Sequence, residues 1–217
     1  IIQEVLIRGM LNKEILIDVL RHFTLFMEIK DGEEVKVVSR YQQYRAVGKI
    51  LKRLRDGKAP NERSGVIWHT QGSGKSLTMV FLIRKLRSCD DLKDYKVILI
   101  NDRTDLEDQL SRTAKLAEEK VNIIDKRKDL RPVLGEDSSN LNMVMMHKFL
   151  EEEIRHSQAL MKAYVEDGIV PEFKPFEVVN DSERVLILID EAHRTQGGDM
   201  GDNLFSAFPH ATKIKIK

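Results

Sequence analysis

A glycine-rich string is the clearest chemical signal in this sequence. Residues 69–76 read His-Thr-Gln-Gly-Ser-Gly-Lys-Ser, after the short apolar run 65–68 and before an apolar helical pattern that begins at Leu77. Gly72 and Gly74 allow the backbone to curl so that successive N–H groups point inward, and the following helix adds its positive N-terminal end. A strand–loop–helix segment of this kind is typical of a phosphate-binding loop.

The side chains that close the string fit a nucleotide bound with Mg²⁺. Lys75 can reach the terminal phosphates, and the Ser76 hydroxyl can hold Mg²⁺. The pattern G-x-x-x-x-G-K-[ST] would place its first glycine at His69, so the string departs from the pattern there. A short glycine-rich string can also arise by chance in a loop, but the flanking strand and helix favour phosphate binding. The predicted ATP-binding residues of the loop are Thr70, Gln71, Gly72, Ser73, Gly74, Lys75 and Ser76.

A pair of carboxylates follows a second apolar run far downstream. The run 185–189 fits a strand buried on both faces, and Asp190 and Glu191 come directly after it. Ligands of open α/β sheets bind at the carboxyl ends of such strands. Asp190 is suited to hold Mg²⁺ through water, and Glu191 to orient and deprotonate an attacking water. The pair could instead cap a helix start; together with the phosphate loop, it predicts an ATPase.

Composition restricts the location and the partners of the chain. Its 217 residues can form one large α/β core, or a core with a small appendage. The 36 basic and 35 acidic residues nearly cancel, so a nucleic-acid contact would require a local patch. The single cysteine, Cys89, excludes an internal disulfide. Without an apolar run of membrane-spanning length or a signal peptide, we predict a cytoplasmic protein with no membrane contact. Because the chain begins with Ile1, we expect it to be a piece of something longer.

Alternating patterns predict an α/β fold with a parallel sheet and helices on both faces. A small segment with a helical pattern to about residue 22, capped in its second stretch by Asn12, and a hairpin around Asp31-Gly32 precede it. Further helices are expected over 41–55, 77–86 and 105–116, and a polar loop over 57–64. Strands are expected at 65–68, 97–100, 121–124, 141–146 and 185–189, with strand-like alternation in 213–217 and an insertion within 150–183.

Four separated segments resemble one superfamily. Residues 40–47, 68–76, 101–110 and 190–196 resemble the Q motif and motifs I, Ia and II of superfamily 2 helicases and translocases. Within it, the strings His-Thr-Gln-Gly-Ser-Gly-Lys-Ser, Asp-Arg-Thr-Asp-Leu and Asp-Glu-Ala-His-Arg look like the R (motor and nuclease) subunit of type I restriction enzymes. Segment 16–26 is similar to the part that joins nuclease and motor in that family.

The resemblance implies a domain organisation. Residues 1–39 would be a linker from an upstream domain, and residues 40–217 a first RecA-like P-loop NTPase lobe, incomplete at its C-terminal end. Motif III would follow Ile214, a second lobe would supply arginines across the nucleotide cleft, and a nuclease domain would precede Ile1. On this reading we expect the isolated chain to bind nucleotide weakly and to hydrolyse little of it.

The resemblance also implies roles for single residues. Gln43 would hydrogen-bond the adenine edge with help from Arg40, although both could simply lie on an exposed polar helix face. His193, with Lys75, Asp190 and Glu191 in the catalytic set, would couple the nucleotide site to DNA-facing parts. Arg103 and Lys148 would contact a DNA backbone. Alternatively, Arg103 is an ordinary surface arginine.

The leading interpretation is therefore one lobe of an ATP- and Mg²⁺-dependent double-stranded DNA translocase that works with the modification and specificity subunits of a restriction complex. The alternatives are a motor lobe of another superfamily 2 DNA helicase, or a nucleotide-binding module that is inactive in isolation.

Overall fold

The computed structural model of this chain describes residues 2–28, 32–70, 72–101, 119–145, 177–190 and 200–217. The helix expected over 105–116 and most of the expected insertion within 150–183 lie outside these residues.

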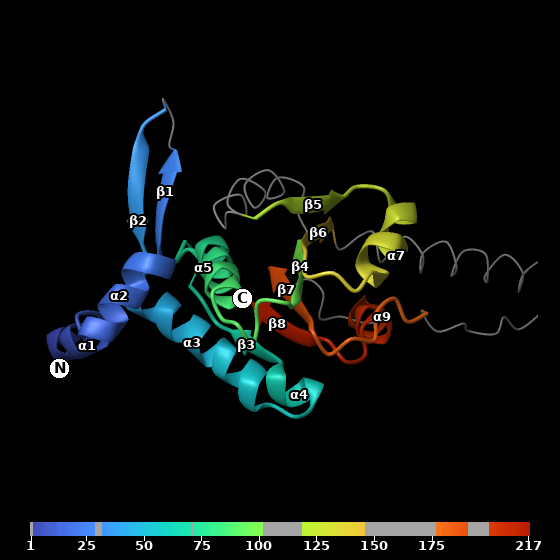
Figure 1. Ribbon diagram of the computed structural model, residues 1–217, viewed down its shortest axis with the longest axis horizontal. Coiled ribbons are helices and arrows are strands. Elements are labelled where there is room, and N and C mark those ends of the chain that lie inside the picture. The colour runs from blue at the N-terminus through green and yellow to red at the C-terminus, as the bar shows by residue number, and fades with distance from the viewer. Residues whose placement is uncertain (1, 29–31, 71, 102–118, 146–176, 191–199) are drawn as a thin grey trace, which may run out of the picture.

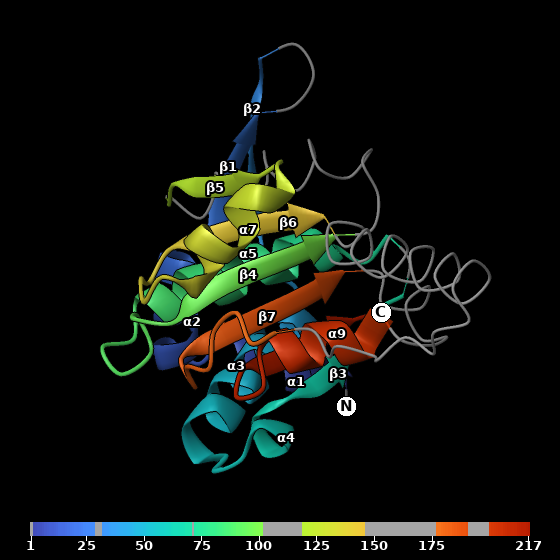
Figure 2. The ribbon, with the colours of Figure 1, turned by 90° about the vertical axis from the view of Figure 1, so that its right-hand side faces the viewer.

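The described residues are organised around a six-stranded sheet in which every strand pair is parallel (Figure 2). The strand order is β3-β8-β7-β4-β6-β5. The strands are β3 (Gly65–Ile67), β4 (Lys96–Asn101), β5 (Val121–Ile124), β6 (Leu141–Met145), β7 (Val185–Asp190) and β8 (Thr212–Ile216). This confirms the predicted α/β class and the five strands expected before residue 190, and the alternation in 213–217 is indeed a strand.

Side chains of the central strands alternate between two apolar cores, one on each face of the sheet. In β4, Val97 and Leu99 belong to one cluster of buried residues, and Ile98 and Ile100 belong to the other. A strand with both faces covered needs an apolar side chain at every position, because successive residues point to opposite sides. The continuous apolar runs in the sequence reflect this double burial.

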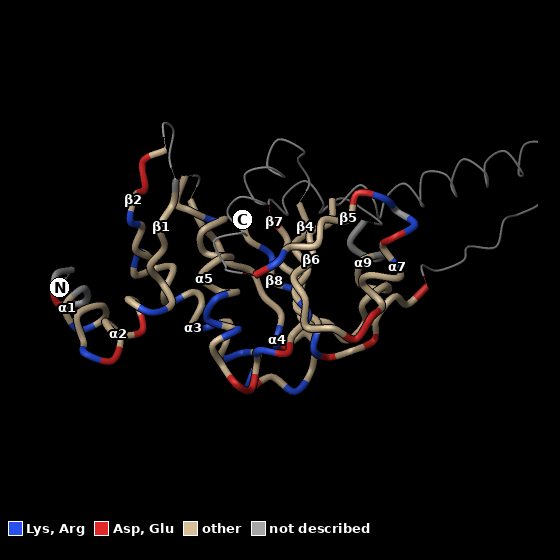
Figure 3. Tube along the Cα trace, turned by 45° about the horizontal axis from the view of Figure 1, so that its top comes forward, with Lys and Arg blue, Asp and Glu red and all other residues tan. Residues whose placement is uncertain are grey.

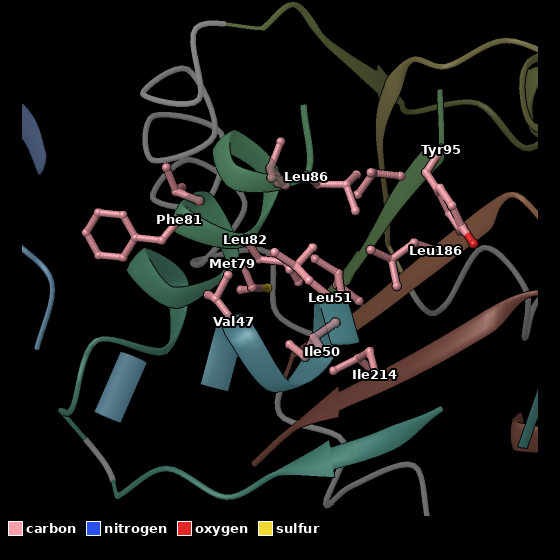
Figure 4. Packing of buried hydrophobic residues seen from close by; sticks show 14 of the residues in the cluster. Val47, Ile50, Leu51, Met79, Phe81, Leu82, Leu86, Tyr95, Leu186 and Ile214 are labelled. Atoms are coloured by element: carbon pink, nitrogen blue, oxygen red, sulfur yellow. The ribbon is translucent and has the colours of Figure 1, made fainter. Parts of the chain in front are cut away.

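Helices cover both faces. On one side lie α3 (Tyr41–Asp56) and α5 (Lys75–Arg87), and on the other α7 (Arg127–Gly135) and α9 (Met200–Ala207) (Figure 1). Val47 and Leu51 of α3 pack with Met79 and Leu82 of α5 above the sheet (Figure 4). The prediction of α3 is confirmed, and α5 begins two residues before the expected Leu77.

The helices and the paired strands of the N-terminal segment agree with its sequence pattern. It forms α1 (Ile2–Met10) and α2 (Lys13–His22), and the Asn12 side chain accepts a hydrogen bond from the Glu14 N–H, as predicted for a cap. Next, β1 (Thr24–Glu28) pairs antiparallel with β2 (Glu34–Val38) in a hairpin that projects from the body (Figure 1). The turn predicted at Asp31-Gly32 includes residues outside the described part of the chain, 29–31, so its type stays a prediction.

The segment before residue 39 shares the core of the sheet domain. Phe23 is buried, with its ring 4.9 Å from that of Tyr44 and 5.7 Å from that of Phe81. Arg84 of α5 donates a hydrogen bond to the Thr24 carbonyl at 3.0 Å. Aromatic packing of this kind stabilises beyond the area it buries. The boundary at residue 39 stays a prediction; its two sides are in contact here.

The polar loop expected over 57–64 is wrong in part, because it contains the short helix α4 (Pro60–Arg63). Arg63 is 4% exposed, and its guanidinium donates to the His210 carbonyl at 3.2 Å and to the Thr212 hydroxyl at 3.3 Å. The proline at the first helical position favours the helix. A buried arginine needs several acceptors, and this one therefore ties α4 to the start of β8.

The buried side chain of Lys213 predicts how the free energy of unfolding changes with pH. Burial lowers the pKa of its ammonium group to about 8 from the usual 10.5. Between these values the unfolded chain binds more protons, so the free energy of unfolding should rise as pH increases, by at most about 3 kcal/mol. Lys213→Met removes this contribution. The advantage of the methionine variant over the parent in chemical denaturation should therefore shrink from pH 8 to pH 10; a constant difference would contradict the assignment.

Candidate nucleotide-binding site

The predicted phosphate loop runs from the end of β3 at Ile67 to the start of α5 at Lys75. Gly72 and Gly74 have φ angles of 73° and 84°, so both occupy the left-handed region that favours glycine. Gly74 directly precedes α5, whose first N–H groups lack helical acceptors and face the loop. A Cβ at Gly74 would lie 2.9 Å from the Gln43 amide nitrogen. Only glycine suits this position; the inward direction of the loop N–H groups stays a prediction.

Register places the acidic strand end beside this loop. Ile67 pairs with Ile216, and Ile216 pairs with Asp190, so these three residues lie in one row across β3, β8 and β7. With strands about 4.8 Å apart, the Cα atoms of Ile67 and Asp190 are roughly 10 Å apart. Asp190 is 6% exposed. A buried carboxylate this close to a phosphate loop suits a bound cation.

The donors fit Mg²⁺. The Ser76 hydroxyl, in the first turn of α5, and the Asp190 carboxylate are the hard oxygen ligands that this ion prefers. Among the described residues, no group of three or more His, Cys, Asp or Glu side chains could hold a metal. Mg²⁺ bound to a nucleotide needs no such cage, because it uses one or two protein ligands with phosphates and water.

Gln43 joins the first turn of α3 to the phosphate loop. Its side-chain oxygen accepts from the Arg40 N–H at 2.8 Å, and its amide nitrogen donates to the Gly74 carbonyl at 3.0 Å. Gln43 is 4% exposed, so the alternative that it lies on an exposed polar helix face does not apply to it. Arg40 is exposed, so that alternative stays open for Arg40. One amide hydrogen and one oxygen lone pair remain beyond these bonds. Adenine recognition by Gln43 and Arg40 stays a prediction.

His69 fills the place where the loop pattern has glycine. Its backbone N–H donates to the Lys217 carbonyl at 2.7 Å, which extends the pairing of β3 with β8, and its ring Nδ1 is hydrogen-bonded to the Ser73 hydroxyl at 3.1 Å. Burial, with help from the Lys75 ammonium group, lowers the pKa of the imidazole. The sequence marked His69 only as a departure from the pattern and did not indicate this contact.

Asn101, the first residue of the segment that resembles motif Ia, had no predicted role at the site. It ends β4 one residue past Ile100, which pairs with Ile189, so it lies at the level of Asp190 on the neighbouring strand. It is 1% exposed. A polar residue closing an apolar strand could have signalled the carboxyl edge of the sheet.

The structure brings together part of the predicted site. Thr70 is exposed beside the loop, and Ser73, Lys75 and Ser76 are half-buried in it. The predicted residues Gln71, Arg103, Lys148, Glu191 and His193 lie outside the described part of the chain, and their roles stay predictions.

Basic residues lie along α3 (Figure 3), and three of them contact partners within the chain. Lys52 lies 3.7 Å from the Asp56 carboxylate, and Arg55 lies 2.6 Å from that of Asp91. Arg53 donates to the Ser64 carbonyl at 2.6 Å. These contacts fit a solvated, internally paired helix face.

A parallel sheet with a phosphate loop after one strand and a buried aspartate at the end of another defines a P-loop NTPase of the RecA-like kind. The family model of the SWI2/SNF2 ATPase matches residues 42–216. The chain therefore belongs to the SWI2/SNF2 ATPase family.

The chain is also similar in sequence to subunits of type I restriction enzymes. The chain is similar to the type I restriction enzyme HindI endonuclease subunit of Haemophilus influenzae, at 30% identity over 202 residues, covering 89% of this chain and 17% of the relative. It is also similar to a Methanocaldococcus jannaschii protein provisionally named as the type I restriction enzyme MjaVIIIP endonuclease subunit, at 29% identity, covering 87% and 19%. The chain thus spans less than a fifth of these relatives. None of the helices in the described residues is long and apolar enough to cross a membrane.

Proposed function

We propose that this chain is the first ATPase lobe of a motor that moves double-stranded DNA, as part of a type I restriction enzyme. The observation that carries the proposal is the row Ile67–Ile216–Asp190, which sets a buried carboxylate two strands from a glycine-bent phosphate loop. This arrangement suits ATP with Mg²⁺.

The chemistry is in-line attack of water on the γ-phosphate, which breaks its bond to the β,γ-bridging oxygen and releases ADP and phosphate. Lys75 binds the terminal phosphates together with the N–H groups of the loop and of the first turn of α5. Ser76 and Asp190 hold the ion, which when bound neutralises charge on the phosphates. Glu191, next to Asp190, orients the water and accepts its proton. Gln43 and Arg40 contact adenine. His193 couples the nucleotide-binding site to the parts of the motor that face DNA.

The proposed partners follow from the relatives and from the chemistry of a motor. The relatives are named endonuclease subunits of type I restriction enzymes, so we propose modification and specificity subunits as partners in a cytoplasmic complex. A motor that moves along any sequence cannot depend on base edges, so its DNA contacts are to the phosphate backbone. Arg103 and Lys148 are the proposed contacts.

ATP turnover tests this proposal. In the full protein that contains this lobe, double-stranded DNA should stimulate ATP hydrolysis, and the motor should displace a third strand annealed along the duplex without separating the duplex strands. Strand separation would favour a different superfamily 2 helicase. Nucleotide binding without turnover, with or without DNA, would favour a binding module.

Arg103→Ala tests the backbone contact. In the same protein it should weaken the apparent affinity for DNA in the ATPase assay roughly tenfold, as expected for one charge-assisted hydrogen bond. The loss should be equal across DNA sequences, with ATP affinity unchanged. Lys52→Ala, on the paired face of α3, is the matched control and should behave like the parent. A loss confined to one DNA sequence, or an equal loss of ATP affinity, would contradict the assignment.

A further inference from the structure

The phosphate loop is closed on itself by two hydrogen bonds. The Ser73 N–H donates to the Thr70 carbonyl at 3.1 Å, which makes a backbone turn, and the Ser73 hydroxyl is bonded to the His69 ring at 3.1 Å. His69 is itself anchored, because its N–H donates to the Lys217 carbonyl at the end of β8. The side-chain bond therefore links the apex of the loop to the sheet.

The hydrogen bond between His69 and Ser73 restricts the conformations that the phosphate loop can adopt. A glycine at position 69 would give the loop a third residue without a side chain, in addition to Gly72 and Gly74. A flexible loop loses more entropy when it is ordered around a ligand, and that loss reduces affinity. A histidine that bonds Ser73 limits the free loop to conformations near the bound one.

The charge of the ring is compatible with this role. Burial and the nearby Lys75 ammonium group lower the pKa of His69, so the imidazole is neutral near pH 7. Within the described residues, Lys75 is the charged group that acts on the ring, and Lys217, the residue after β8, contacts His69 through backbone atoms. A neutral ring shares a hydrogen bond with Ser73 without adding a second cation beside Lys75.

We propose that His69 is a positioning residue that holds the phosphate loop, through Ser73, in the conformation that receives nucleotide phosphates. The role rests on the proposed function, because it presumes that the loop binds a nucleotide. His69 acts through Ser73 and need not contact the phosphates. A residue that only supports the fold would instead change stability and leave the affinity of the folded chain unaltered.

Nucleotide affinity in a set of variants tests the role. The probe is a fluorescent ADP analogue with Mg²⁺, titrated into the full protein that contains this lobe. His69→Ala, His69→Gly and Ser73→Ala should each bind about fivefold more weakly, the effect of one hydrogen bond. The double variant His69→Ala/Ser73→Ala should bind no more weakly than either alanine variant, because both remove the same contact. His69→Asn should recover most of the affinity, since its amide can stand where Nδ1 does. His210→Ala, an exposed histidine at the other end of β8, is the control and should bind like the parent.

A spectroscopic signature checks the contact without nucleotide. The Nδ1 resonance of His69 should move in Ser73→Ala, and the ring should titrate below the usual histidine range in the parent. Parent-like affinity in His69→Ala, or additive losses in the double variant, would overturn the role of His69 and leave the proposed function intact. Failure of the full parent protein to bind the analogue would overturn the proposed function, and the role of His69 with it.

Discussion

Lys75→Ala should reduce nucleotide affinity by on the order of 100-fold, because it removes a charge-assisted contact to the phosphates. Lys75 is the first residue of α5, directly after Gly74, and its half-buried position keeps the ammonium group at the loop. The N–H groups that we propose to bind the phosphates remain in the variant, so the loss should fall on affinity and not on the fold. Isothermal titration with a non-hydrolysable ATP analogue and Mg²⁺ measures it.

The matched control for this change is Lys128→Ala. Lys128 is an exposed lysine of α7, which covers the opposite face of the sheet from α5, so its loss should leave affinity unchanged. Circular dichroism and the thermal midpoint of each variant show whether the fold persists. If the folded Lys75 variant binds the analogue as the parent does, the phosphate-loop assignment is wrong.

The sheet was predictable from sequence because its central strands are buried on both faces. Runs such as 97–100 and 185–189 have to be apolar at every position, and such runs stand out against a chain in which 33% of residues are charged. The helix α7 escaped prediction because it is short, contains Pro132 and buries only Leu130 and Leu134 on the sheet. So few apolar residues do not establish a helical period.

The local sequence patterns of the candidate site were easier to recognise than the arrangement of its residues in space. The loop string and the acidic pair are local patterns, and local patterns can be read directly. The row that joins Ile67 to Asp190 depends on β8 lying between β3 and β7, and strand order is a non-local property of the chain. For the same reason, the bond from Gln43 to the Gly74 carbonyl, 31 residues apart, left no local signal.

Glu191→Gln should uncouple binding from hydrolysis. Glutamine keeps the size and one oxygen acceptor of glutamate but cannot take a proton, so removing the general base should lower ATP turnover by about 10²–10⁴ while ATP still binds. In the full protein with DNA present, single-turnover hydrolysis and retention of radiolabelled ATP measure the two quantities separately. Turnover at the parent rate would show that Glu191 is not the base.

Asp190→Asn makes the comparison specific. Asp190 and Glu191 are neighbours in sequence, but Asp190 is the buried carboxylate in the row with Ile67, and its proposed task is to hold Mg²⁺. Its variant should therefore weaken Mg²⁺-dependent ATP binding as well as turnover, and raising the Mg²⁺ concentration should restore part of the binding. Glu191→Gln should show no such response to Mg²⁺. If both variants bind ATP alike at every Mg²⁺ concentration, the assignment of ion binding to Asp190 and water activation to Glu191 is wrong.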